Sequence, residues 1–337
     1  MGTNRQETTR LAPSPTGALH LGNARTFLIN WALARRSGWR IVLRIEDLDT
    51  PRIKPGAIDG LASTLRWLGI DWDPPVLGPP QSPLIQSHDL EPYREAMRSL
   101  AERGLAYPCD LSRAQIEAAA SAPQEGSHET AFPKALRPPL AGAPIDFDRA
   151  QADARQRAGG SANWRFLCPP GEVAFTDRFA NSQSFDPSEI IGDFVLWTKR
   201  DLPSYQLAVV VDDDRQGITQ IVRGDDLLDS AARQLLLYRA LGLGPEPAYW
   251  HLPLVIGADG KRLAKRHGDT RIDYYREKDV PPDAIMGLVA HWSIPGTPRA
   301  PMTPAEFKDR FDPATMRRYP VTFTPEDDAW LLSQAER

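Results

Sequence analysis

The sequence is poor in cysteine, since Cys109 and Cys168 are the only two among 337 residues. Two thiols cannot build a disulfide framework, and they cannot supply the four thiolates of an all-cysteine zinc site within one chain. The sequence also contains no run of about 20 apolar residues and no apolar stretch at its start, so neither a bilayer span nor a secretion signal is indicated. We therefore expect reduced thiols, a cytoplasmic location and no membrane partner.

An excess of charge of one sign is also absent. The 40 Lys and Arg residues against 44 Asp and Glu residues give a formal net charge of −4. This balance argues against indiscriminate binding to nucleic acid, although a local basic face is compatible with it. Hydrophobic residues make up 41% and charged residues 25% of the chain, which is typical of a globular protein. The length allows two domains, or one large domain with an insertion.

Strand and helix patterns alternate at the start of the chain. A strand is expected to end at residues 9–11, a helix to cover 21–36 up to Gly38, a buried strand to cover 39–47 and a second helix to cover 57–70. This order predicts parallel pairing and an α/β fold. Residues 74–190 are rich in Pro, Gly and Ala and show a weaker pattern. We interpret them as an insertion or a smaller domain.

The α/β pattern returns after residue 190. Three apolar runs predict strands, at 194–199 (FVLWTK), 205–213 (YQLAVVVDD) and 218–224 (ITQIVRG), and a helix is expected over 227–242. Beyond residue 270 the sequence indicates short helices, at DYYREK, PPDAIMGLVAHW and about 305–311.

Two segments indicate a phosphate site. In RLAPSPTGALHLGN, residues 10–23, His20, Gly22 and Asn23 lie where a turn leads into a helix. The N–H groups at a helix start, and its positive dipole end, favour bound phosphate. In KRLAKR, residues 261–266, Lys265 could close over the same phosphates. Together the two segments suggest chemistry at the α-phosphate of ATP.

Five segments together resemble the catalytic core of the glutamyl-tRNA synthetase family. They are PSPTGALHLGNART, LRIEDLD, YQLAVVVDD, VRGDDLL and KRLAKRHG, which follow one another in order over most of residues 9–270. The resemblance implies a class I synthetase fold, that is, a Rossmann-like parallel sheet split by an inserted α+β subdomain that binds an acceptor stem. It implies an ATP-dependent ligase that joins glutamate to ATP as an adenylate and passes the glutamyl group to RNA.

The resemblance also implies roles for single residues. Arg10 and Arg223 would bind the carboxylates of glutamate, in an order left open, and Glu46 would pair with its ammonium group. His20 and Lys265 would act in catalysis, and Mg²⁺ would bridge phosphate oxygens. The residues expected at glutamate are Arg10, Leu11, Ala12, Pro13, Ser14, Glu46, Tyr205 and Arg223; those at ATP are His20, Gly22, Asn23 and Lys265; the signature loop is Arg262, Leu263, Ala264, Lys265 and Arg266.

Two departures from the family pattern stand out. Ala264 occupies the position of a small hydroxyl residue and Arg262 that of the first lysine, so one loop hydrogen bond would be missing while the cationic charge remains. Many relatives carry a zinc site that begins with Cys-x-Cys after Tyr-Pro, but here Leu111 stands at the second cysteine position. We therefore expect no protein metal site and no zinc.

The expected division of the chain is a first catalytic half at 1–84, an inserted subdomain at 85–190, a second catalytic half at 191–260, and the signature loop with a helical stem-contact-like region at 261–337, without an anticodon-binding domain.

Within the family, two segments are more similar to short members than to full-length enzymes. They are LRIEDLDTPRIKPGA and LPSYQLAVVVDDDRQGITQIVRGDDLLDS. The short members glutamylate queuosine in the anticodon of tRNA(Asp). We expect a monomer that uses L-glutamate, ATP and tRNA(Asp).

Two alternatives stay open. HGDTRIDYYREK and FTPEDDAW resemble the stem-contact region of full-length enzymes, which favours a shortened enzyme that charges the acceptor end of tRNA(Glu). The second alternative is a catalytically weak relative that binds glutamate or tRNA, which would fit Ala264, Arg262 and the missing cysteine.

Basic residues that could contact RNA phosphates are Arg113, Lys134, Arg137, Lys308, Arg310, Arg317 and Arg318.

Overall fold

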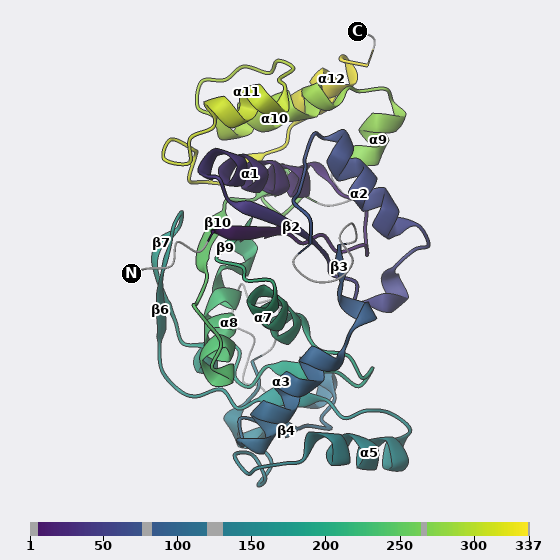
Figure 1. The fold of residues 1–337 in the computed structure, drawn as a ribbon, viewed down its shortest axis with the longest axis vertical. Coiled ribbons are helices and arrows are strands. Elements are labelled where there is room, and N and C mark those ends of the chain that lie inside the picture. Colours follow the sequence, from purple (N-terminus) through teal and green to yellow (C-terminus); the bar gives the residue numbers. More distant parts are fainter. Residues whose placement is uncertain (1–5, 76–82, 120–130, 264–267, 336–337) are drawn as a thin grey trace.

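The computed structural model describes residues 6–75, 83–119, 131–263 and 268–335 (Figure 1). Five strands form one parallel sheet in the order β10-β9-β1-β2-β3. These strands are β1 (Thr8–Leu11), β2 (Arg40–Ile45), β3 (Leu84–Ile85), β9 (Gln220–Gly224) and β10 (Ala248–Leu252). The chain runs from β1 outward to β2 and β3, and it later returns on the other side of β1 to form β9 and β10. The strand order therefore reverses between β1 and β9, which is where open α/β sheets bind ligands at the carboxyl ends of their strands. The expected α/β fold with a parallel sheet is confirmed.

The first strand leads directly into α1 (Leu21–Ser37). The Nδ1 atom of His20 accepts a hydrogen bond from the Gly22 N–H at 3.2 Å and caps the start of this helix. Gly38 ends α1 in the left-handed conformation, with φ 69°, which glycine adopts without a steric penalty. The predicted helix at 21–36 and its stop at Gly38 are confirmed, as is α2 (Ala57–Trp67).

The strand expected at 205–213 is wrong, because this segment forms α7 (Tyr205–Arg215). Ser204 caps the helix by accepting a hydrogen bond from the Leu207 N–H. The residues from Leu207 to Asp213 are all buried, so the helix shows no polar face and its run of three valines imitates a buried strand. Helix α7 packs against α8 (Leu228–Leu241) and α3 (Glu91–Glu102).

Between β3 and α7 the chain builds a second region, most of which lies in the lower half of Figure 1. Its core contains Phe147, Trp164 and Trp197, and the Phe147 ring lies within 5.5 Å of both tryptophan rings, between centroids. Strands β4 (Ala106–Pro108), β5 (Trp164–Phe166) and β8 (Val195–Trp197) form an antiparallel sheet, and β6 (Val173–Asp177) and β7 (Asn181–Phe185) form a hairpin. The helices here are α3, α4 (Arg113–Ala119), α5 (Phe147–Ala158) and α6 (Pro187–Ile190), and the short 3-10 turns are Gln86–His88 and Lys134–Leu136.

The strand expected at 194–199 exists as β8, but it pairs with β5 in this antiparallel sheet and not in the parallel one. The limits at residues 84, 190 and 260 remain a prediction. Beyond the expected limit at 190, β8 still pairs with β5, so the hydrogen bonding of the second region extends past that residue.

A layer of short helices after residue 270 covers α1, at the top of Figure 1. The predicted helices are confirmed as α9 (Ile272–Glu277), α10 (Pro282–Ser293) and α11 (Pro304–Arg310), and α12 (Pro325–Leu332) follows. Strands β11 (Val255–Ile256) and β12 (Val321–Thr322) pair beside them, and 3-10 turns lie at Thr50–Arg52 and Asp225–Leu227. None of the described helices has the length and apolar character that a bilayer span needs.

Helix α10 approaches the backbone of residue 300 so closely that only glycine fits at position 287. A Cβ added to Gly287 would lie 1.9 Å from the Ala300 carbonyl oxygen. We expect Gly287→Ala to destabilise the fold by about 1–3 kcal/mol, the usual cost of overpacking. Urea unfolding measures this change. Gly60→Ala in α2 is the matched control, because a Cβ there meets nothing within 4 Å. Alanine favours a helix over glycine by up to about 1 kcal/mol, so this variant should not lose stability. Equal losses in both variants would contradict the packing argument.

Candidate active site

A cavity of about 340 Å³ opens at the carboxyl edge of the parallel sheet, where the strand order reverses. Arg10 comes from β1, Glu46 follows β2 and Arg223 lies on β9. The start of α1 closes another side. Of the residues expected at the substrates, the cavity is lined by Arg10, Ala12, His20, Gly22, Asn23, Glu46, Tyr205, Arg223 and Arg262.

The Asp213 carboxylate of α7 holds one side of this cavity together. Its Oδ1 atom accepts hydrogen bonds from Arg44 Nη1 at 2.7 Å and from Arg10 Nε at 3.3 Å. Arg44 also donates to Glu46 Oε1, at 3.2 Å from Nη2. Arg44 is fully buried, and Asp213 is 1% exposed. A buried charge needs a partner of opposite sign, so these four side chains form one interdependent network.

Burial and the network act on Glu46 in opposite directions. Burial is the larger effect and raises the pKa of its carboxyl above the usual value, while the guanidinium groups of Arg44 and Arg10 lower it. Burial disfavours the charge of Arg44 as well, but Asp213 and Glu46 raise the pKa of its guanidinium above the usual value. The ionised form of Glu46 would therefore gain from a further cationic partner in the cavity.

Arg223 is held in a different way. Its Nε donates to His251 Nε2 at 2.9 Å, its Nη1 to Gln234 Oε1 at 2.8 Å, and its Nη2 to the Leu227 carbonyl oxygen at 3.2 Å. All three acceptors are neutral. A guanidinium has five N–H groups, so within the described residues these bonds leave one N–H on each terminal nitrogen. This pair suits a carboxylate bound through both oxygens.

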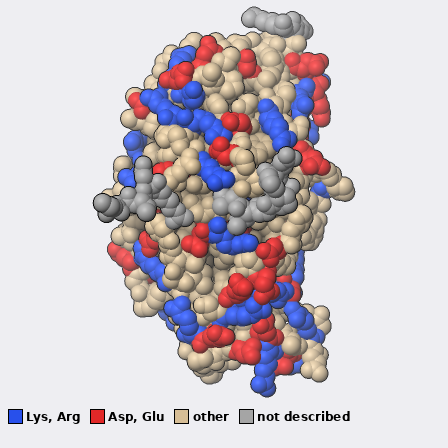
Figure 2. All heavy atoms as spheres, viewed as in Figure 1, with Lys and Arg blue, Asp and Glu red and all other residues tan. Residues whose placement is uncertain are grey.

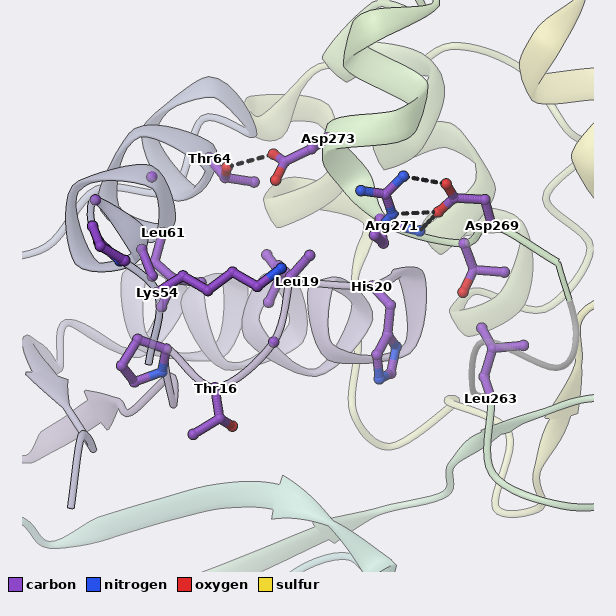
Figure 3. A pocket seen from close by; sticks show the side chains of 18 of the residues that line it. Thr16, Leu19, His20, Lys54, Leu61, Thr64, Leu263, Asp269, Arg271 and Asp273 are labelled. Carbon is purple, nitrogen blue, oxygen red and sulfur yellow. Dashed lines mark hydrogen bonds and ion pairs between the residues drawn. The ribbon is translucent and has the colours of Figure 1, made fainter. Parts of the chain in front are cut away.

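His20 lines both the first cavity and a second, larger one of about 1000 Å³, which Figure 3 shows. Burial, together with nearby Arg262, lowers the pKa of His20 to about 4, so the ring is neutral at physiological pH. Because Nδ1 accepts the Gly22 N–H, the proton is on Nε2, which can donate to a ligand. In the larger cavity Lys54, from the segment before α2, extends toward Leu19, while Arg271 pairs with Asp269 (Figure 3).

A third cavity, of about 760 Å³, adjoins the first through the shared residues Glu46 and Tyr205. It lies between the parallel sheet and the second region, whose residues Lys199 and Arg200 line it. Arg200 pairs with Asp49 at 3.2 Å. A ligand in this cavity would therefore reach the first site from the side of the insertion.

The remaining expected residues occupy different positions. Tyr205, 40% exposed at the start of α7, lines both the first and third cavities. Leu11 is fully buried in the hydrophobic core, because alternate residues of a strand face opposite sides. The Pro13 carbonyl accepts the Glu46 N–H at 3.1 Å, and Ser14 lines the third cavity.

The structure describes only the start of the signature loop. Arg262 forms an ion pair with Asp226 at the edge of the first cavity. Leu263 is buried, and its N–H donates to the Val255 carbonyl oxygen at 3.1 Å. The predictions for Ala264, Lys265 and Arg266 lie outside the described residues.

Sequence reasoning missed the residues that hold the arginines in place, namely Arg44, Asp213, Gln234 and His251. A charged residue inside a buried strand pattern, such as Arg44 in RIVLRI, was the one available signal. Gln234 and His251 carry no local signal, because their partners are distant in sequence.

Several basic residues proposed for RNA have structural partners. Arg137 forms two hydrogen bonds of 2.8 Å with the buried Asp193, and Arg318 lies 4.7 Å from the Phe179 ring centroid. Lys134 pairs with Glu189 at 2.6 Å. Figure 2 shows basic and acidic side chains interspersed over one face. The RNA-contacting residues therefore remain a prediction.

Both cysteines are buried, and burial raises the pKa of the Cys168 thiol to about 12. Among the described residues, no group of three or more His, Cys, Asp and Glu side chains is placed to hold a metal ion.

Comparisons with known proteins agree with this fold and site. Residues 7–320 match the family model described as "tRNA synthetases class I (E and Q), catalytic domain". The chain belongs to this family, and its activity is of the ligase class.

Within the family, the chain is 45% identical to the glutamyl-Q tRNA(Asp) synthetase of Symbiobacterium thermophilum, over 96% of this chain and 97% of that protein. It is 43% identical to the protein of the same name from Rhodopirellula baltica, over 89% and 88% of the two chains. The solved glutamate tRNA ligase from Elizabethkingia meningosepticum, in complex with its amino acid, superposes with a TM-score of 0.78 at 27% identity, covering 97% of this chain and 69% of that one. The resemblance noted in the sequence is confirmed.

The shared carboxylate at Asp213 predicts a large effect on stability. Asp213→Asn keeps the shape of the side chain but removes the charge that two buried arginines face. We expect a loss of about 3 kcal/mol or more in the free energy of unfolding, measured by urea denaturation. Asp214→Asn, at the next and half-buried carboxylate, is the control, with an expected change within about 0.5 kcal/mol. A loss at Asp213 no larger than at Asp214 would rule out this network as a structural support.

Proposed function

We propose that this protein activates L-glutamate with ATP to form glutamyl-adenylate and transfers the glutamyl group to tRNA. The observation that carries the proposal is the pairing, in one cavity, of a carboxylate at Glu46 with an arginine at Arg223 whose described acceptors are all neutral. An amino acid has the complementary charges, an ammonium group and a carboxylate, and glutamate carries a second carboxylate on its side chain.

Glutamate would place its ammonium group at Glu46 and its side-chain carboxylate on the two remaining N–H groups of Arg223. Arg10 also lines the cavity, but Asp213 already partly neutralises it. A neutral glutamine side chain would leave the Arg223 charge without a counterion, so the pocket favours glutamate over glutamine.

ATP would bind at the start of α1, beside Gly22 and Asn23, and enter as its Mg²⁺ complex. Helix N-termini favour phosphate, and the Nε2–H of His20 supplies a neutral donor there. The phosphate tail would extend past His20 toward the larger cavity, into which Lys54 reaches. Lys265 is proposed to neutralise charge on the same phosphates.

The chemistry needs no protein nucleophile. The glutamate α-carboxylate attacks the α-phosphorus of ATP, the bond to the bridging oxygen breaks, and pyrophosphate leaves with the electron pair. A hydroxyl of the RNA then attacks the acyl carbon of the adenylate and AMP leaves. The protein therefore acts by holding the reacting groups together and by stabilising charge at the phosphates.

The RNA acceptor is proposed to be queuosine in the anticodon of tRNA(Asp). Support comes from the two glutamyl-Q tRNA(Asp) synthetases that the chain matches over most of their length. The third cavity offers a route for a nucleoside, since it reaches Glu46 and Tyr205 from the side of the insertion. The alternative acceptor is the end of tRNA(Glu), because glutamate–tRNA ligases such as that of Oleidesulfovibrio alaskensis share 36% identity.

Exchange of radioactive pyrophosphate into ATP tests the first step. We expect exchange that depends on glutamate and is far weaker with glutamine. His20→Ala should lower kcat roughly 100-fold, because a donor to the reacting phosphates is lost. His88→Ala is the matched control, since this histidine is exposed and lines none of the three cavities. Absence of glutamate-dependent exchange, with and without tRNA, would instead favour a protein that only binds glutamate or tRNA.

Transfer of labelled glutamate identifies the acceptor. We expect labelling of tRNA(Asp) that contains queuosine, and none of the same tRNA(Asp) with unmodified guanosine at that position. Removal of the terminal adenosine should leave the labelling intact, because the proposed ester is on the anticodon. Labelling confined to tRNA(Glu), and lost with its terminal adenosine, would establish the alternative acceptor.

A further inference from the structure

The side chain of His251 connects Arg223 to a part of the chain that the sequence places in the insertion. Strands β9 and β10 are parallel, and their register puts His251 opposite Arg223. His251 Nε2 accepts the Arg223 Nε–H at 2.9 Å, and His251 Nδ1 lies 2.6 Å from Asp177 Oδ2. Asp177 is the last residue of β6, in the hairpin that packs against β10.

The three side chains form a buried chain with a defined direction. Arg223 is 5% exposed, and Asp177 and His251 are each 1% exposed. Since a guanidinium only donates, the Nε2 atom of His251 must carry a lone pair, which places the ring proton on Nδ1. That proton is then donated to Asp177.

The surroundings keep His251 neutral and Asp177 ionised. Burial lowers the pKa of His251 to about 4, although Asp177 and the Leu227 backbone carbonyl act in the opposite direction. Burial opposes the charge of Asp177, but the His251 ring and the N–H groups of Ala180 and Phe179 lower the pKa of this carboxyl below its usual value. Tyr249 stacks on His251 at 5.7 Å between centroids and an angle of 8°, and it also lies 5.2 Å from the Arg223 guanidinium carbon.

We propose that Asp177 and His251 are positioning residues for glutamate, which fix the ring tautomer that holds Arg223 with its two remaining N–H groups toward the substrate carboxylate. The β6–β7 hairpin thereby contributes to the amino-acid site without lining its cavity. This inference rests on the glutamate-binding role proposed for Arg223.

Two substitutions at His251 separate its two contacts. In His251→Gln the amide oxygen can take the place of Nε2 and accept from Arg223, whereas in His251→Asn the shorter amide retains only the contact toward Asp177. We expect KM for glutamate in the exchange assay to rise about tenfold or more in His251→Asn, the loss expected for a hydrogen bond to a charged group. It should rise much less in His251→Gln, and KM for ATP should stay within about a factor of two in both.

Asp177→Asn tests the tautomer. Asp177 Oδ1 accepts the N–H groups of Phe179 and Ala180, so an asparagine would keep its oxygen there and turn its NH₂ group toward His251 Nδ1. The ring proton would then move to Nε2. The His251 Nε2–H and the Arg223 Nε–H would face each other, and neither group could accept a hydrogen bond. KM for glutamate should rise as in His251→Asn. In the His251→Gln background the same change should have no further effect, because glutamine has no tautomers.

Glu172→Gln is the matched control, because Glu172 lies beside the same hairpin, exposed, and bonds only Ser184 among the interactions described. Its KM values should equal those of the unchanged protein. Nitrogen NMR of the His251 ring determines the tautomer directly in the unchanged protein, so this measurement does not depend on the folding of any variant. We expect a protonated Nδ1 and an unprotonated Nε2 at neutral pH.

Three results would overturn the positioning role: the opposite tautomer, an unchanged KM for glutamate in His251→Asn and Asp177→Asn, or a parallel rise in KM for ATP. Absence of glutamate-dependent exchange in the unchanged protein, by contrast, would refute the proposed function, and the NMR measurement would still decide the tautomer.

Discussion

The carboxylate of Asp213 is the constraint on which the site depends. It comes from α7 and bonds arginines from two neighbouring strands, Arg10 of β1 and Arg44 of β2. Removing three charges from water is costly, and mutual pairing offsets that cost only when the geometry is right. The helix can therefore not shift along the sheet without separating buried charges, and Glu46, bonded to Arg44, is fixed in the same way.

This constraint makes the two arginines of the cavity unequal. Arg10 already faces a carboxylate, so a second carboxylate there gains less and is repelled by Asp213 and Glu46. Arg223 has neutral acceptors, and the Asp177 carboxylate lies behind the imidazole of His251. A ligand carboxylate gains most at Arg223, and a ligand cation gains most at Glu46. The sequence left open which arginine binds which carboxylate, because a sequence shows only residue types. The assignment depends on the groups that already bond each arginine in the fold.

Local patterns predicted much of the fold. Periodicity and the glycine at position 38 located α1 and its end, and alternation of strands and helices implied the parallel sheet. They failed at 205–213, because a helix buried on all sides loses its polar stripe and its valines imitate a strand. Asp213 illustrates the consequence. It was visible in the sequence as part of VVVDD, but its function as a shared counterion follows from a helical position beside two strands. Likewise, no local pattern relates Asp177 to His251, which lies 74 residues away.

The site is assembled from segments that are remote in sequence but adjacent in the sheet. Arg10 and Glu46 precede the inserted region, Tyr205 and Arg223 follow it, and Asp177 reaches Arg223 through His251 from the hairpin between them. Each of these charged side chains is buried or partly buried, so each needs its partner in place to remain ionised without a large energetic cost. The proposed amino-acid site therefore depends on the meeting of β1, β2, β9 and β10 at one edge of the sheet.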